Sequence, residues 1–145
     1  MRQTIILLAA FGLLCGAAGR QEEKAKQEKK LWAAISTSTP IRDWPAFSVD
    51  VFTVHFALVN DGDKTVDPKI ESSQLLVNGK ELKNWDYIIA NGIRSTNWKS
   101  LTPGDHLHFT YGLGKDFEEP GIYKLKWKGK AFESAEIVLR VLPKR

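Results

Sequence analysis

The chain has 145 residues, which leaves room for one domain. Charged residues make up 26% of it and hydrophobic residues 43%, a balance typical of a globular protein and not of a disordered chain or a membrane protein. One Cys excludes an internal disulfide, one Cys and three His are too few for a zinc-finger framework, and a net charge of +4 spread along the chain argues against a nucleic-acid partner.

Residues 1–19 have the three-part layout of a secretory signal peptide: Arg2, an apolar run from Ile5 to Leu14, and small residues before charge begins. The run is shorter than the roughly 20 apolar residues of a transmembrane helix. We therefore expect export to the periplasm or the medium, with no transmembrane segment in the mature chain. A lipid anchor on Cys15 is the less favoured route, because Gly12 stands where lipoproteins usually have Leu.

Residues 20–30 read RQEEKAKQEKK and have no apolar face, so they are predicted to form a solvated charged tether. Residues 31–145 are predicted to be one domain of short strands separated by turn residues. In chain order the expected strands are 31–36, 49–60, 74–77, 80–82, 107–111, 123–127 and 136–142, with 85–90 as a helical turn or a strand. None of these segments is predicted to be a helix long enough for a parallel crossover.

Alternation and turn chemistry indicate how these strands fold together. One face of 49–60 is apolar and is predicted to be buried; it consists of Phe52, Val54, Phe56 and Leu58. Asn78-Gly79 suits a two-residue hairpin turn, and Tyr123 follows Pro120-Gly121 at the place of a tyrosine corner. The fold class predicted is therefore all-β, an immunoglobulin-like antiparallel β-sandwich of about seven strands with Trp127 in its core.

Four segments carry a resemblance to known domains. LTPGDHLHFTYGL (101–113) followed by EPGIYKLKWKG (119–129) resembles the last strands of secreted bacterial immunoglobulin-like domains. FALVNDGDKTV (56–66) with LLVNGKEL (75–82) resembles the intracellular proteinase inhibitor domain of bacilli, which is also a β-sandwich. The resemblance spans residues 49–142 and implies a small exported bacterial protein of this fold. It supplies no inhibitory residue to transfer, since fold alone does not give function.

Three histidines form a candidate metal site. If the strands at 49–60 and 107–111 are neighbours in one sheet, His55 lies on the outer face of the first and His106 and His108 lie on the outer face of the second. Three imidazoles can bind zinc or copper. The alternative is an ordinary polar sheet face, because the register between the strands is open at this stage.

Trp85, Asn91 and Trp98 form a candidate ligand site on loops. The two Trp lie in stretches rich in Asn and Gly, and an exposed loop Trp can stack on a sugar or anchor a protein contact. The alternative is that these rings close the open end of the sandwich. A further basic stripe, Lys124, Lys126 and Lys128, is expected on an outer sheet face, either as solvated strand protection or as a dock for an acidic partner.

The sequence contains no nucleophile motif such as G-x-S-x-G, and its acidic residues fall in predicted turns. We therefore expect no enzymatic activity and no cofactor. The function predicted is a non-catalytic exported binding or accessory module for a protein or a carbohydrate. The alternatives are a zinc- or copper-binding protein and an enzyme inhibitor.

Overall fold

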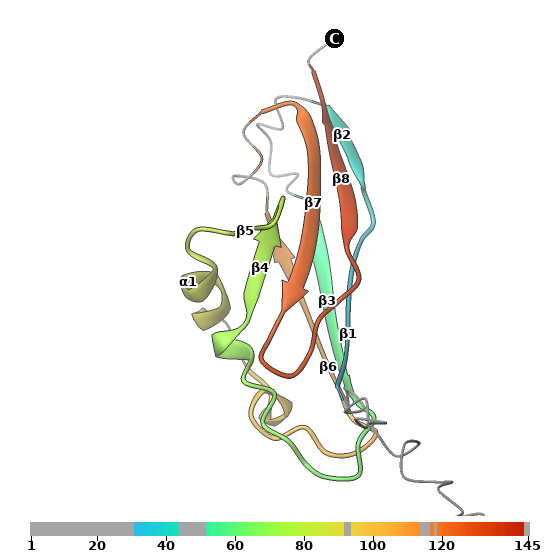
Figure 1. Cartoon of the computed structure of the whole chain (residues 1–145), viewed down its shortest axis with the longest axis vertical. Coiled ribbons are helices and arrows are strands. Elements are labelled where there is room, and N and C mark those ends of the chain that lie inside the picture. Colours follow the sequence, from blue (N-terminus) through green and yellow to red (C-terminus); the bar gives the residue numbers. More distant parts are fainter. Residues whose placement is uncertain (1–30, 44–51, 92–93, 114–116, 118, 144–145) are drawn as a thin grey trace, which may run out of the picture.

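A computed structural model describes residues 31–43, 52–91, 94–113, 117 and 119–143, which form two sheets packed face to face (Figure 1). The three-stranded sheet has the order β1-β3-β6, with β1 at Leu31–Thr37, β3 at Thr53–Asn60 and β6 at His106–Gly112. The five-stranded sheet has the order β2-β8-β7-β4-β5, with β2 at Ile41–Asp43, β8 at Ile137–Leu142, β7 at Gly121–Lys128, β4 at Gln74–Val77 and β5 at Lys80–Glu81. This confirms the all-β sandwich.

The core lies between the sheets and follows from the alternation in the strands. The predicted buried face of β3 is buried along its whole length, from Phe52 to Leu58. From the other sheet Leu125 and Trp127 of β7 pack toward it, and the rings of Phe56 and Trp127 meet edge to face at 5.4 Å. Alternate residues of each strand therefore point to solvent, and two outer faces are left for function.

Two turn predictions are confirmed by backbone geometry. Asn78 and Gly79 both have positive φ, of 50° and 77°, as the tight turn between β4 and β5 requires. The Tyr123 hydroxyl donates a hydrogen bond to the Glu119 carbonyl oxygen at 2.6 Å, which is the expected tyrosine corner. The segment from Trp85 to Ala90, left open between helix and strand, is the helix α1.

The prediction of a purely antiparallel sandwich is wrong at one edge. The chain crosses from β1 to the other sheet and forms β2, which pairs in parallel with β8, so the described residues contain eight strands. The Arg140 amide donates to the Pro40 carbonyl oxygen at 2.7 Å and so continues this pairing beyond β2. Because β2 has three residues directly after Pro40, sequence alone indicated only a break there.

The remaining short elements lie at one end of the sandwich. They are the 3₁₀ turns η1 at Ile70–Ser72 and η2 at Thr96–Trp98, and η1 lies against α1. Within the described ranges, no helix is long and apolar enough to cross a membrane. The signal peptide, the tether and the start of the predicted 49–60 strand lie outside the described residues.

Candidate functional site

The outer face of the three-stranded sheet is free of Lys, Arg, Asp and Glu. We call it the neutral face, and its residues are Trp32, Ala34 and Ser36 of β1, Thr53, His55, Ala57 and Val59 of β3, and His106, His108, Thr110 and Gly112 of β6. Of its two large hydrophobic side chains, Trp32 is the more open to solvent, with 67% of its surface exposed against 38% for Val59. An exposed Trp on a surface without Lys, Arg, Asp or Glu distinguishes this face from ordinary solvated sheet.

The register of the strands arranges the neutral face in rows across the sheet. Trp32 pairs with Val59, which pairs with His106, so that an aromatic ring, a branched aliphatic side chain and an imidazole lie side by side. The next row, starting at Ala34, continues through Ala57 to His108. The two Ala leave Trp32 standing above its surroundings on one side, where a partner surface can reach it.

The structure brings two of the three histidines of the predicted site together. β3 and β6 are antiparallel neighbours, and the rings of His55 and His108 stack with centroids 5.9 Å apart and planes 18° from parallel. His106 does not join them, because it pairs with Val59, whereas His55 pairs with Thr110 at the other end of the register. Across the described part of the chain, no three His, Cys, Asp or Glu side chains are grouped as a metal site would require.

Trp85 is a core residue and not an exposed loop residue. Only 1% of its surface is exposed, its ring packs at 5.4 Å from Phe56, and its Nε1 donates to the Ser73 hydroxyl at 3.4 Å. The same hydroxyl accepts a hydrogen bond from Trp127 Nε1 at 3.0 Å. One buried serine therefore satisfies two indoles, and the surface that sequence reasoning assigned to Trp85 is absent.

Trp98 is also buried, with 8% of its surface exposed, and lies between Phe109 at 5.1 Å and the Arg94 guanidinium at 5.2 Å. Asn91 is exposed, but its side chain donates to the Tyr87 carbonyl oxygen at 3.0 Å at the end of α1. Both Trp rings are packed into the core and do not stand on the surface. The exposure predicted for these rings is therefore wrong, and the ligand site predicted at them has no open aromatic surface.

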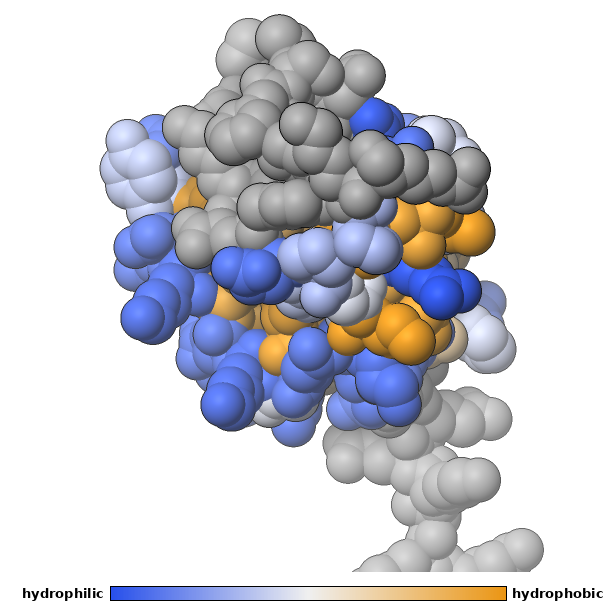
Figure 2. Space-filling view, turned by 90° about the horizontal axis from the view of Figure 1, so that it is seen from above, coloured by the Kyte–Doolittle hydropathy of each residue, from blue (hydrophilic) through white to orange (hydrophobic). Residues whose placement is uncertain are grey.

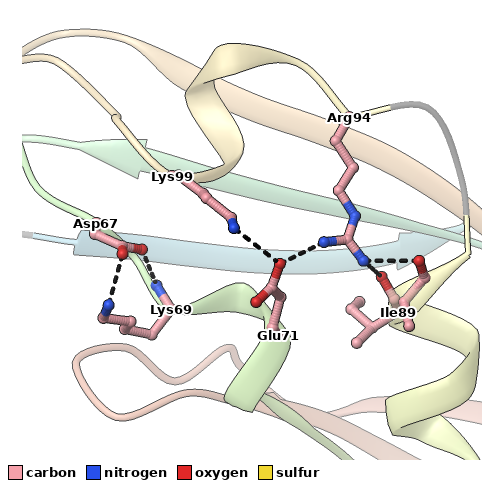
Figure 3. Close-up of polar contacts among 7 residues, drawn as sticks. Asp67, Lys69, Glu71, Ile89, Arg94 and Lys99 are labelled. Atoms are coloured by element: carbon pink, nitrogen blue, oxygen red, sulfur yellow. Dashed lines mark hydrogen bonds and ion pairs between the residues drawn. The ribbon is translucent and has the colours of Figure 1, made fainter.

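The end of the sandwich beside η1 holds a cluster of charges that the sequence analysis did not predict (Figure 3). Arg94 donates to Glu71 and to the carbonyl oxygens of Ile89 and Ala90 at 2.9 and 2.8 Å, and so ties the end of α1 to η1. Lys99 approaches the same Glu71 carboxylate at 3.7 Å. Arg94 lies 23 residues from Glu71, so no local pattern could have paired them.

A cavity of about 100 Å³ lies next to this cluster and is lined by Asp67, Lys69, Ile70, Glu71, Ser72, Trp98 and Lys99. Hydrogen bonds from the Lys69 side chain and backbone N–H lower the pKa of the Asp67 carboxyl below its ordinary value, and Asp67 in turn raises the pKa of Lys69. Each carboxylate of the lining is already held by a cation. Lys69, Arg94 and Lys99 face two carboxylates, so the cluster ties α1 to η1 and keeps one positive charge in excess.

The outer face of the five-stranded sheet is charged. We call it the basic face, and it is marked by Lys124, Lys126, Lys128 and Arg140. Lys126 pairs with Glu133, and Lys124 lies 3.6 Å from Glu136. Exposed apolar side chains such as Ile122 and Val138 stand between these charges. Seen end-on in Figure 2, the apolar surface is broken into patches by hydrophilic side chains.

Comparison with known proteins identifies no family for this chain and finds two similar solved structures. No family model matches the chain, and no curated protein matches it. Two solved structures are similar to it, and both are of the CARDB domain of the PF1109 protein from Pyrococcus furiosus: a solution NMR structure and a crystal structure in complex with di-metal ions. Each is 15% identical with a TM-score of 0.46, and the matches cover 78% and 79% of this chain and 94% of the other. Neither structure supports the resemblance to the proteinase inhibitor domain, and neither indicates the role of any residue in this chain.

Proposed function

We propose that this chain is a non-catalytic binding module that docks a protein partner on its neutral face. One observation carries the proposal: a whole sheet face without Lys, Arg, Asp or Glu displays a Trp that is 67% exposed. The centres of protein interfaces are depleted in charge and enriched in aromatic residues. Trp is also among the residues that most often dominate binding energy.

The shape of the surface favours a protein over a small molecule. The neutral face is the side of a three-stranded sheet, and none of the residues that line the cavity beside η1 belongs to it. Small ligands bind mainly in concave, apolar pockets. A flat face with a protruding ring instead suits a second flat surface that covers Trp32 and Val59 together.

Export remains part of the proposal, and its support is the pattern of residues 1–19. The test is N-terminal sequencing of the protein from the producing cell and its medium. A mature chain that starts at Gly19 or Arg20 supports export. A chain in the cytosol that still carries Arg2 contradicts it.

Site-specific photo-crosslinking in the producing cell tests the binding function. A benzophenone amino acid at Ala57, in the middle of the neutral face, is expected to capture a protein partner that mass spectrometry identifies. The same group at Lys126, on the basic face, is the matched control and is expected to capture none. The substitution Trp32→Ala is expected to abolish the crosslink from position 57.

Two outcomes contradict the proposal. One is equal capture from positions 57 and 126, which would mean that the neutral face has no special role. The other is no protein partner at position 57, or only another copy of the chain. In that case a carbohydrate ligand is the next candidate, and it can be tested by binding to immobilised glycans with Trp32→Ala as the control.

A further inference from the structure

The free edge of β1 exposes backbone groups in a regular pattern. The Asn60 amide donates to the Asp105 carbonyl oxygen at 3.0 Å, and the Leu113 amide donates to the Phe52 carbonyl oxygen at 2.9 Å. Even-numbered residues of β3 therefore bond toward β6, and odd-numbered residues bond toward β1, because backbone groups alternate sides along a strand. In the register between β1 and β3, the odd-numbered residues of β3 pair with the even-numbered residues of β1, so even-numbered residues of β1 bond to β3.

The N–H and C=O groups of the odd-numbered residues of β1 consequently point away from the sheet; these residues are Leu31, Ala33, Ile35 and Thr37. β1 stands at the end of the sheet order, and no other strand among the described residues pairs with this side. Unpaired backbone groups along an edge strand form a template for pairing with another strand.

The other sheet edges of the described structure are shorter or partly capped. β2 has three residues and β5 has two, which limits the hydrogen bonds that either can offer. On β6, the His106 carbonyl oxygen accepts a hydrogen bond from Asn97 Nδ2 at 3.1 Å. β1 is seven residues long and contains no charged residue, Pro or Gly. It therefore lacks the devices by which proteins usually prevent pairing at an edge.

We propose that the β1 edge binds the β1 edge of a second copy of this chain, antiparallel and centred on Ala34. The three-stranded sheets of the two copies then form one sheet of six strands. In this register Ala33 lies opposite Ile35 of the partner subunit, and Leu31 lies opposite Thr37 of the partner subunit. All four outward-bonding residues then fall in hydrogen-bonded pairs, as antiparallel geometry requires.

The side chains of β1 are self-complementary in this register. Trp32 is opposite Ser36 of the partner subunit, and Ala33 is opposite Ile35 of the partner subunit, so a large side chain meets a small one on both faces. At the two-fold axis Ala34 meets its own copy, where a small side chain permits close approach. No like charges face each other, which removes the usual penalty for pairing a strand with itself. This symmetry favours a second copy over an unrelated strand.

The proposal goes beyond the binding function above and does not depend on it. The neutral face of the dimer would be continuous across both copies, with two Trp32 rings near the axis. A partner could bind to a monomer, and a dimer could form without a partner, so each proposal can fail alone.

Sedimentation equilibrium of the protein, purified as the cell produces it, tests the dimer. The test variants place a charge at position 34, which lies on the proposed two-fold axis. Wild type is expected to dimerise between about 1 µM and about 1 mM. Ala34→Lys and Ala34→Glu are each expected to weaken the dimer about fivefold or more, because like charges then meet at the axis. An equimolar mixture of the two variants is expected to dimerise again, since Lys and Glu then face each other.

The matched control is Ala131→Lys, an exposed Ala outside the strands, which is expected to leave the dimer unchanged. Circular dichroism is expected to be the same for all variants, because Ala34 is exposed on the outer face. A wild-type protein that stays monomeric throughout the range overturns the proposal. So do single variants that dimerise as wild type does, and a mixture that does not regain the dimer.

Discussion

The two outer faces of the sandwich differ in what surrounds their exposed apolar side chains. On the basic face, exposed apolar residues such as Ile122 and Val138 stand among lysines, and Lys126 and Lys124 are paired with glutamates. On the neutral face, Trp32 has no charge beside it in its own row, which runs through Val59 to His106. Both faces cover the same core, so the fold does not require the difference. This difference is the reason why we propose the neutral face, and not the basic face, as the binding surface.

The largest loss of stability is expected at the buried Trp127, and the exposed Trp32 is the residue to compare it with. Trp127→Ala should lower the free energy of unfolding by about 3–5 kcal/mol, because a fully buried ring is lost from the core. Trp32→Ala should change it by less than about 0.5 kcal/mol, since its ring is mostly in solvent. Urea denaturation measures both. A large loss of stability in Trp32→Ala would make Trp32 structural and would remove the contrast between the faces.

The next largest loss of stability is expected at Ser73, whose hydroxyl accepts hydrogen bonds from both Trp85 and Trp127. Ser73→Ala should cost about 2 kcal/mol, because it leaves the N–H groups of Trp85 and Trp127 buried without an acceptor. Ser72→Ala, at an exposed neighbouring position, is the control and should be nearly neutral. Thermal melting of both variants checks this. Equal melting temperatures would mean that water or another group satisfies the two indoles.

A smaller loss of stability is expected at the tyrosine corner formed by Tyr123. Tyr123→Phe should cost about 1 kcal/mol, because only the hydroxyl and its bond to the Glu119 carbonyl oxygen are lost. Tyr87→Phe is the control, since Tyr87 is 70% exposed on α1. Chemical denaturation of the pair separates the two. If both variants lose the same stability, the corner bond contributes nothing beyond the general effect of removing a hydroxyl.

The smallest effect is expected on the basic face itself. Lys126→Ala should cost at most about 0.5 kcal/mol, because its pair with Glu133 is partly exposed and water competes with it. The loss should shrink further in high salt, which denaturation at two salt concentrations measures. A loss of several kcal/mol that does not change with salt would contradict this prediction, because a solvated charge pair is weak and is screened by salt.

Much of the sandwich could be predicted because alternation is a local property. The apolar series in 52–58 and the turn residues at Asn78-Gly79 gave faces and turns directly. The histidine site needed the register between β3 and β6, which pairs residues 47 to 59 positions apart and separates His106 from His55. Register is not encoded in either strand alone.

The burial of the Trp residues could not be predicted from the local sequence either. Trp85 and Trp98 lie in segments that read as loops, yet tertiary packing buries them against Phe56 and Phe109. Trp32 lies in a segment predicted only to be a strand, and the structure shows that β1 is an edge strand whose even-numbered side chains face solvent. Which side of a strand is buried follows from its place in the sheet, and that place is a property of the whole fold.

Hydroxyl-radical footprinting of Trp32 and Tyr87 tests the central claim most directly. The two side chains are almost equally exposed, at 67% and 70%, but only Trp32 lies on the neutral face. We expect both to be modified in the dilute purified protein, and Trp32 alone to become protected in the producing cell. Equal modification of the two residues in the cell would contradict the claim that the neutral face is a binding surface.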